Sequence, residues 1–327
     1  MLLLTFLIIG AGICACLTTG EKAEQKSMLK NRKDISGIYE IPKSYYKRTC
    51  NAGRLEEITY DVKLTDGTGR TARKSAMVYI PYAYSKKEKY DVFYLIHGSG
   101  GSQHTYLGSR LLPRTFKRIL DNMIVNGDIK PTIVVTPTFT KSIRDYYTCL
   151  DGISHEVTHE LMRKVESEYS TYAKDTTESA FRASRGHRAF GGFSMGGCAT
   201  WRLLRDHADY AKYFLPISMP IYYVDNGYNQ NMSESGADEI VRGVETSGAN
   251  RRDYMVFASS GTADFMCHGT EMQARDLTKY NEWFKWFNYA DENTDDGNIT
   301  FYAWKDRKHH FYKTYPYLYN GLIRFFR

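Results

Sequence analysis

The chain has 327 residues, of which 42% are hydrophobic and 25% are charged. These proportions are ordinary for a soluble globular protein, and the length suits one α/β domain with a sizeable core. The formal net charge is +7, but the basic residues are scattered among acidic ones without a long basic run, which argues against nucleic acid as a partner. The sequence shows no feature that requires an obligatory protein partner.

The first 16 residues form an apolar run, MLLLTFLIIGAGICAC, which is followed by a polar stretch. The run is shorter than the roughly 20 residues that a membrane-spanning helix needs, so we predict an export signal over residues 1–20. The end of the run, I-C-A-C, also resembles a bacterial lipobox that would leave Cys16 lipidated, although no Lys or Arg precedes the apolar core. Secretion and lipid anchoring at the cell surface both stay open. Residues 21–49 are interpreted as a linker or extension, and residues 50–327 as the folded domain.

Cysteine usage is compatible with export. Removal of the leader would leave Cys50, Cys149, Cys198 and Cys267, which could pair in three ways or remain free thiols. For Cys198 we favour a buried free thiol.

Apolar, β-rich runs alternate with helical patterns along the chain. The predicted strands cover residues 55–64, 75–82, 90–96, 132–135, 187–190, 213–217, 254–259 and 299–304. The predicted helices lie near residues 110–126, 153–169, 198–207, 270–287 and 316–326. Repeated strand-then-helix units predict an α/β fold, with a mainly parallel sheet flanked by helices.

A glycine-rich segment joins the predicted strand 187–190 to the helix 198–207. It contains Gly192-Phe193-Ser194-Met195-Gly196, a G-x-S-x-G pattern typical of a nucleophile elbow. The alternative is a glycine-rich turn whose serine only caps the helix. The strand-turn-helix context favours Ser194 as a nucleophile.

Two later strand ends supply the partners that a serine nucleophile needs. Asp264 follows the strand 254–259, and His309 and His310 follow the strand 299–304. An imidazole takes the serine proton, and a carboxylate orients that imidazole. Nucleophile, acid and base also occur in the order that α/β-hydrolases use. Asp225, after the strand 213–217, is the alternative acid.

A developing oxyanion requires backbone N–H donors. We expect one from Met195 in the elbow and a second from Ser99, in the His97-Gly98-Ser99 loop after the strand 90–96. His97 itself is interpreted as structural.

Several stretches resemble carbohydrate esterase family 1, the feruloyl and acetyl-xylan esterases related to esterase D. The stretches are CNAGRLEEITY, YLIHGSGG, HRAFGGFSMGG and SGTAD, in this order. The resemblance implies an α/β-hydrolase fold and a serine esterase that needs no cofactor or metal. It also implies a feruloylated or acetylated plant-wall polysaccharide as partner, with feruloyl esters of arabinoxylan favoured; acetyl-xylan esterase or generic carboxylesterase activity is the alternative.

The family's C-terminal G-H-D-F or G-H-D-W is replaced here by K-H-H-F. Matching on Phe311 and on the L-Y-N at 318–320 assigns the base to His309 and puts His310 where the family has Asp. The doubled histidine keeps His310 as the alternative base.

Aromatic acyl groups need a flat apolar slot beside the nucleophile. Met219, Ile221, Tyr222 and Tyr223 follow the strand 213–217, and Tyr106 follows the oxyanion loop. We predict that they line this slot; alternatively, they only cover the end of the sheet.

Two rival functions remain to be weighed. His155-Glu156-Val157-Thr158-His159 matches the H-E-x-x-H zinc-protease motif. However, the helix's apolar stripe leaves both histidines facing away from it, which favours a solvated surface without metal. A non-catalytic wall-binding module would explain a tyrosine-rich surface but not three catalytic residue types in the right order.

Overall fold

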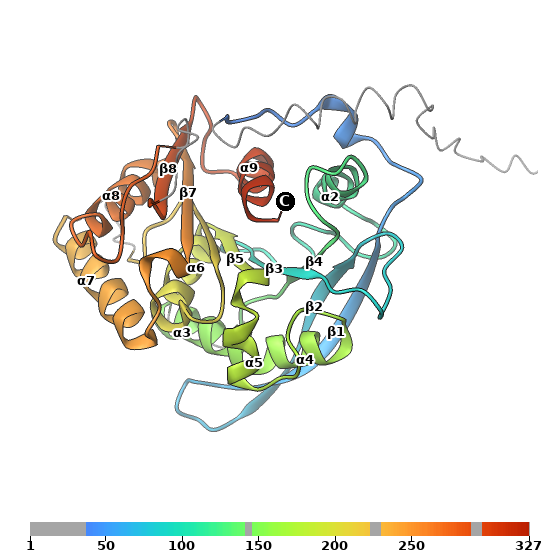
Figure 1. Ribbon diagram of the computed structural model, residues 1–327, viewed down its shortest axis with the longest axis horizontal. Coiled ribbons are helices and arrows are strands. Elements are labelled where there is room, and N and C mark those ends of the chain that lie inside the picture. Colours follow the sequence, from blue (N-terminus) through green and yellow to red (C-terminus); the bar gives the residue numbers. More distant parts are fainter. Residues whose placement is uncertain (1–36, 141–145, 223–229, 289–295, 327) are drawn as a thin grey trace, which may run out of the picture.

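The computed structural model describes residues 37–140, 146–222, 230–288 and 296–326. Its centre is an eight-stranded sheet with the strand order β1-β2-β4-β3-β5-β6-β7-β8 (Figure 1). β1 and β2 pair antiparallel, β2 pairs antiparallel with β4, and the remaining neighbours are parallel. The mainly parallel α/β sheet predicted from the sequence is therefore confirmed.

All eight predicted strands form, with shifts of a few residues at their ends. They are β1 (Arg54–Lys63), β2 (Thr71–Ile80), β3 (Asp91–Ile96), β4 (Thr132–Thr136), β5 (Arg188–Phe193), β6 (Tyr213–Ile217), β7 (Met255–Gly261) and β8 (Ile299–Trp304). Every residue of the central strands β3 and β5 is buried. This burial agrees with the absence of polar residues after the first position of each strand, because parallel strands are covered on both faces.

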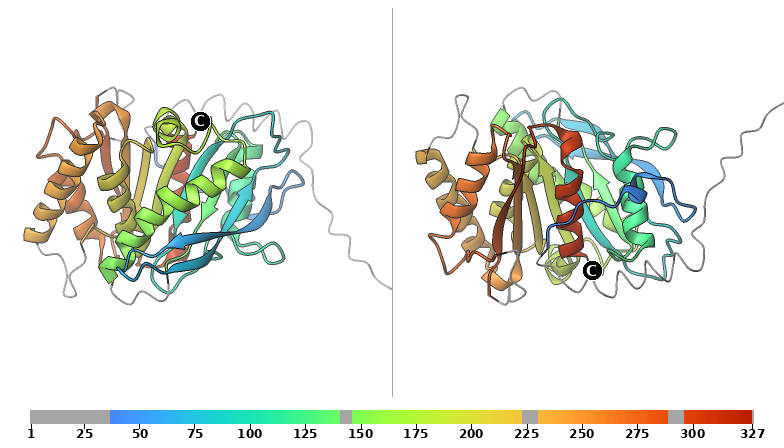
Figure 2. Two further views of the ribbon diagram at one scale, coloured as in Figure 1. Left: turned by 90° about the horizontal axis from the view of Figure 1, so that it is seen from below. Right: turned by 90° about the horizontal axis from the view of Figure 1, so that it is seen from above.

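Helices cover both faces of the sheet (Figure 2). One face packs against α2 (Thr115–Val125) and α9 (Tyr315–Phe325). The other face packs against a larger group: α3 (Tyr146–Glu156), the π-helical segment η2 (Val157–Leu161), α4 (Met162–Glu168), α5 (Glu178–Ala183), α6 (Met195–His207), α7 (Gln230–Ser247) and α8 (Cys267–Leu277). Within the described residues, none of the helices is long and apolar enough to cross a bilayer.

The helix predictions were wrong at several places. α5 and α7 were not predicted. α2 begins five residues later than expected, because 108–113 folds into a loop closed by a bridge between Gly108 and Pro113. α8 stops at Leu277, after which the chain turns and Trp286 bridges to Ile299 in β8.

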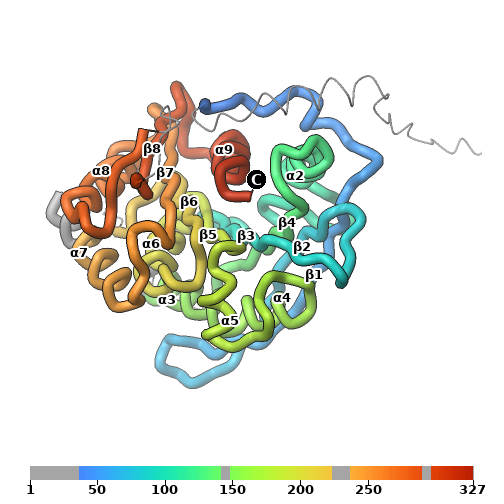
Figure 3. The backbone as a smooth tube through the Cα atoms, viewed as in Figure 1, coloured from blue at the N-terminus to red at the C-terminus, as the bar shows by residue number. Residues whose placement is uncertain are grey.

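The chain that precedes β1 packs onto the domain (Figure 3). The Tyr39 N–H donates to Asn320 Oδ1 at 2.9 Å, and Arg324 donates to the Gly37 carbonyl at 2.8 Å. Tyr45 in the short helix η1 (Lys43–Tyr46) is buried against the core beside α2 and α9. The last part of the predicted extension 21–49 is thus docked on the domain.

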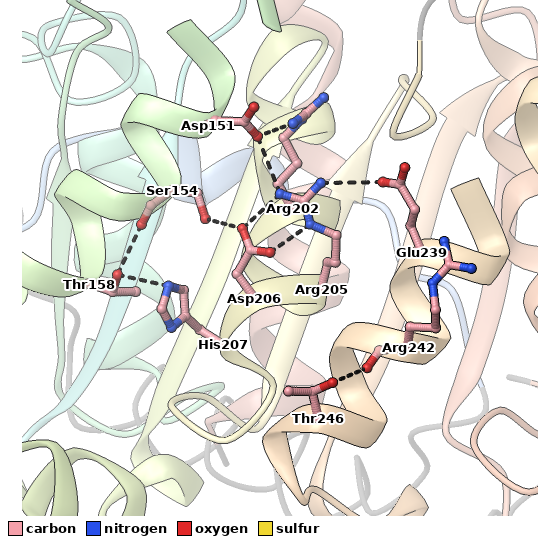
Figure 4. Close-up of polar contacts among 10 residues, drawn as sticks. All are labelled: Asp151, Ser154, Thr158, Arg202, Arg205, Asp206, His207, Glu239, Arg242 and Thr246. Atoms are coloured by element: carbon pink, nitrogen blue, oxygen red, sulfur yellow. Dashed lines mark hydrogen bonds and ion pairs between the residues drawn. The ribbon is translucent and has the colours of Figure 1, made fainter. Parts of the chain in front are cut away.

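A polar network fastens α6 to its neighbours on the same face (Figure 4). Arg205 on α6 donates to Asp151 on α3 at 3.2 Å and to Glu239 on α7 at 3.4 Å. Arg202 also pairs with Asp151, and Ser154 on α3 donates to Asp206 at 3.3 Å. This network matters for the site because α6 begins directly after Ser194.

Three of the four cysteines beyond the leader, Cys149, Cys198 and Cys267, are free thiols. None of the three disulfide pairings considered for these four cysteines is therefore formed. Cys198 is fully buried, and its thiol donates to the Ile221 carbonyl at 2.8 Å, as favoured from the sequence.

Candidate active site

Ser194 lies at the sharp turn between β5 and α6. Its backbone adopts φ 56° and ψ −121°, in a region that non-glycine residues rarely occupy. The Ser194 N–H donates to the Ile217 carbonyl at the end of β6 at 2.8 Å. The turn therefore holds the serine side chain at the carboxyl edge of the sheet, as expected for a nucleophile elbow.

The glycines of the elbow are needed because backbone segments approach closely there. A Cβ on Gly196 would lie 2.2 Å from the Ile96 carbonyl oxygen, and one on Gly192 would lie 2.5 Å from the Gly196 oxygen. Contacts this short are not tolerated by any side chain. The glycine-rich sequence thus reflects the tight packing of the turn against the end of β3.

A chain of hydrogen bonds joins the three side chains predicted from the sequence. His309 Nε2 lies 2.9 Å from Ser194 Oγ, and His309 Nδ1 lies 2.9 and 3.0 Å from the two carboxylate oxygens of Asp264. An ionised carboxylate can only accept, so Nδ1 carries the proton and Nε2 is left to accept from the serine hydroxyl. Asp264 is fixed in turn by the Met266 N–H, which donates to Oδ1 at 2.8 Å.

Hydrogen bonds tie together the loops that carry the acid and the base. The Thr262 N–H donates to the Trp304 carbonyl at 2.8 Å, and the Asp306 N–H donates to the Thr262 hydroxyl at 2.8 Å. A Cβ on Gly261 would lie 2.0 Å from the Arg307 carbonyl oxygen. The relative position of Asp264 and His309 is thus set by contacts between two loops that are far apart in the sequence.

Aromatic rings flank the histidine that faces the serine. The rings of Phe193 and Phe265 lie 4.6 and 4.5 Å from the His309 ring, centroid to centroid. His310 is exposed, and its Nδ1 accepts from the Tyr312 N–H at 3.3 Å. The geometry therefore brings His309, rather than His310, to the nucleophile.

A cleft of about 540 Å³ opens over Ser194 and His309. Its described lining also includes the glycine-rich loop 98–102, with Ser99, and the side chains of Thr105, Arg114, Phe193, His310, Phe311 and Tyr312. An added Cβ on Gly98 would lie 3.1 Å from the Ser194 Cβ, so this loop abuts the nucleophile. Met195 is the first residue of α6, where backbone N–H groups have no acceptor within the helix. Both predicted oxyanion donors therefore belong to segments that meet at Ser194.

Among the described residues, none of those predicted to form the aromatic slot lines this cleft. Tyr106 is only 1% exposed and lies beneath Phe311, with their ring centroids 5.7 Å apart. Met219 and Ile221 are buried, and Tyr222 packs toward α6, with its ring 5.8 Å from the Arg202 guanidinium. Tyr223 and the alternative acid Asp225 lie outside the described residues.

The sequence analysis missed two aromatic residues that lie close in sequence to the catalytic side chains. Phe265 follows Asp264 directly and is 67% exposed, and Tyr312 lies three residues after His309 and is 54% exposed. The signal available in the sequence was an aromatic residue one to three positions after the predicted acid and the predicted base.

The H-E-x-x-H segment does not form a metal site. Glu156 is buried, accepts from the Tyr60 hydroxyl at 2.5 Å and pairs with Lys74. The rings of His155 and His159 stack face to face, 3.9 Å apart, so their nitrogens do not converge on one ion. Among the described residues, no group of three His, Cys, Asp or Glu side chains is arranged to hold a metal.

The sheet, the elbow and the Ser194–His309–Asp264 alignment together define an α/β-hydrolase with the site geometry of a serine hydrolase. A scan of family models gives no match. Solved structures do match the chain. The feruloyl esterase module from Clostridium thermocellum is 32% identical, with a TM-score of 0.74, and the match covers 89% of this chain and 94% of that one. The chain belongs to carbohydrate esterase family 1, the family of the feruloyl esterases.

Further relatives agree with this assignment. Endo-1,4-beta-xylanase Y of Acetivibrio thermocellus is 33% identical over 291 residues, which make up 85% of this chain and 24% of that protein. An endo-1,4-beta-xylanase/feruloyl esterase of Xylanibacter ruminicola is 29% identical over 167 residues, or 47% of this chain and 20% of that protein. The chain thus spans about a quarter or less of the length of these curated relatives. The ferulic acid esterase of Anaeromyces mucronatus, 18% identical with a TM-score of 0.58 over 86% of this chain and 94% of that one, shares the fold.

Proposed function

We propose that this protein is a serine carboxylic-ester hydrolase that releases ferulate from feruloylated arabinoxylan. The observation that carries the proposal is the continuous alignment of Ser194, His309 and Asp264 in an open cleft. Membership in a family that includes feruloyl esterase modules, some of them in xylanases, supports the acyl group and the polysaccharide.

The geometry supports a two-stage mechanism. Ser194 Oγ attacks the ester carbonyl while His309 Nε2 takes its proton, and Asp264 stabilises the imidazolium that forms. The oxyanion is stabilised by the N–H groups of Met195 and Ser99. The carbonyl–alcohol bond then breaks, and His309 gives its proton to the departing sugar oxygen, which leaves a feruloyl-serine ester.

Water completes the cycle in the second stage. His309 removes a proton from the water that attacks the feruloyl-serine ester, and it returns that proton to Ser194 Oγ as ferulate leaves. Each step uses only side-chain and backbone groups of the chain, so the proposed reaction needs no cofactor.

The apolar walls of the site favour an aromatic acyl group over acetyl. Phe265 is exposed beside His309, and Phe311 and the exposed Tyr312 line the cleft. Burying an aromatic ring against such side chains contributes a few kcal/mol at most. We therefore expect kcat/KM for feruloyl esters to exceed that for acetyl esters by roughly ten- to a thousandfold.

The decisive experiment compares wild type with Ser194→Ala on methyl ferulate, nitrophenyl acetate and acetylated xylan. Removal of the nucleophile should lower kcat by at least about three orders of magnitude without loss of the fold, as monitored by circular dichroism. Turnover by Ser194→Ala within tenfold of wild type would overturn the serine mechanism. Faster hydrolysis of acetylated xylan than of methyl ferulate would replace feruloyl by acetyl as the acyl group.

We also propose that the protein is exported. The apolar run of residues 1–16 supports this, and the I-C-A-C sequence adds lipid anchoring at Cys16 as one form of it. Expression of the full chain in a bacterial host, with labelled palmitate and cell fractionation, tests both forms. Label that disappears in Cys16→Ser indicates an anchor, unlabelled protein outside the cytoplasm indicates secretion, and protein that stays in the cytoplasm contradicts export.

A further inference from the structure

One wall of the active-site cleft carries a cation that pairs with no acidic side chain among the described residues. The Arg114 guanidinium lines the same cleft as Ser194 and is exposed. It lies 5.8 Å from the centroid of the Phe311 ring, which also lines the cleft. Within the described part of the chain, Arg114 forms no ion pair, whereas Arg110, four residues before it, lines a different groove together with Glu56 and Glu57.

The surroundings of this cation are electropositive. No Asp or Glu occurs among the described residues that line the cleft. Asp264 is shielded behind His309, with only 1% of its side chain exposed. Two helices begin at the cleft, α2 directly after Arg114 and α6 directly after Ser194, and neither has an acidic residue in its first turn. Helix N-termini carry partial positive charge, so an anion in the cleft meets attraction from three sources.

We propose that this cleft contains a subsite for a carboxylate on the sugar chain, that is, for a uronic acid residue near the feruloylated sugar. The inference rests on the proposed function. The carboxyl group of ferulate is consumed in the ester that Ser194 attacks, so a bound anion must belong to the alcohol half of the substrate. The planar guanidinium offers two parallel N–H donors that match a carboxylate, and the Phe311 ring limits its orientation.

The expected effect is modest because the pair is exposed to solvent. Such a contact changes affinity by a few-fold to about tenfold, and salt screens it. The wild-type enzyme should therefore have a kcat/KM about three- to tenfold higher for an acidic than for a neutral feruloylated oligosaccharide, and the ratio should fall toward one in 0.5 M salt.

The experiment uses feruloylated arabinoxylan oligosaccharides that carry glucuronic acid, and the same oligosaccharides after reduction of the carboxyl group to the alcohol. The acidic-to-neutral ratio of kcat/KM is measured for wild type, Arg114→Gln, Arg114→Lys and the matched control Arg110→Gln. We expect Arg114→Gln to bring the ratio to about one, Arg114→Lys to keep part of it and Arg110→Gln to leave it unchanged. Methyl ferulate should be hydrolysed by all four proteins at rates within about twofold of each other.

Each other outcome has a definite meaning. Equal ratios in wild type and Arg114→Gln overturn the subsite. If Arg114→Gln alters only inhibition by free ferulate, the cation binds the released acid rather than the sugar chain, and the proposal fails. Absence of turnover of methyl ferulate by wild type would instead refute the proposed function, so the two failures are distinguishable.

Discussion

At the scale of single residues, two adjacent histidines have different surroundings. His309 is enclosed by Phe193 and Phe265 and bonds to both Ser194 and Asp264. His310 is exposed, and its Nδ1 accepts a hydrogen bond from the backbone of the following turn. A base must lie within hydrogen-bond reach of the proton that it removes. The alternative assignment of the base to His310 therefore has no geometric support.

Substitution of each histidine tests this distinction. His309→Ala should reduce kcat on methyl ferulate by roughly three orders of magnitude or more, because the serine loses its base. His310→Ala should keep kcat within about fivefold of wild type. Steady-state kinetics of both variants, with circular dichroism as a check of folding, decides the matter. A larger loss in His310→Ala would transfer the role to His310.

At the scale of elements, the meeting of two loops sets the geometry of acid and base. The loop after β7 and the loop after β8 cross at Gly261, where the Arg307 carbonyl leaves no room for a side chain. Because hydrogen bonds from Thr262 and Asp306 link the two loops, displacement of one is transmitted to the other.

Gly261→Ala should consequently lower kcat by about ten- to a hundredfold, since a small displacement of a catalytic group has effects of this size. Gly186→Ala is the matched control, because a Cβ there meets no atom within 4 Å. Kinetics on methyl ferulate and thermal unfolding separate lost alignment from lost folding. Full activity in a folded Gly261→Ala protein would contradict the role assigned to this crossing.

A second element, the junction of η2 with the end of α6, contains a cluster of histidines. The His207 ring lies 5.7 Å from the His159 ring. Figure 4 shows the contact of His207 with Thr158, whose Oγ1 lies 3.1 Å from His207 Nε2. Burial lowers the pKa of His207 to about 4, and the neighbouring His155 and His159 reinforce this effect. The groups around it that favour the charged form are Asp206 and Asp209. Glu178 and Arg182, which pair with each other, lie in the same pocket.

The cluster predicts a loss of stability on acidification. The folded state disfavours protonation of His207, whereas the unfolded chain takes up the proton near pH 6.5, so the free energy of unfolding should fall between pH 6.5 and 4. The His207 contribution is on the order of 1–3 kcal/mol. Urea unfolding of wild type and His207→Gln at pH 7.5 and pH 5 measures it. Identical pH dependence in the two proteins would show that His207 is not responsible.

At the scale of the whole molecule, the fold leaves the zinc-protease motif far from the chemistry. Its glutamate is committed to a buried pair with Lys74, and its histidines lie beside the end of α6 opposite to Ser194. The motif's function is structural in this arrangement, because Glu156 joins the helix to β1 and β2 through Tyr60 and Lys74.

A chelator such as EDTA should therefore leave hydrolysis of methyl ferulate unchanged. The double substitution His155→Ala with His159→Ala should keep kcat within about threefold of wild type. Activity is compared before and after dialysis against the chelator, and again after zinc is added. A loss that zinc restores would favour the metal mechanism over the serine mechanism.

The sequence by itself determined the eight strands in chain order, most of the helices between them and the three residue types of the site. These are local properties: strand burial shows as continuous apolar runs, and a tight strand-to-helix turn requires glycines next to Ser194. Placing Asp264 and His309 after later strands was enough to predict that they meet Ser194, because parallel strands end at one edge of the sheet.

The tertiary structure decided what depends on contacts between distant segments. α7 was missed because Gly236 and Gly243 interrupt its apolar stripe; they allow close approach to Ile221 and Arg205, which no local pattern reveals. Tyr106 is buried and packs against Phe311, whereas Arg114 lines the cleft that contains Ser194. The direction of a side chain and its partners depend on packing at the edge of the sheet. Only the folded molecule therefore distinguishes a residue that lines the site from one that is buried behind the lining.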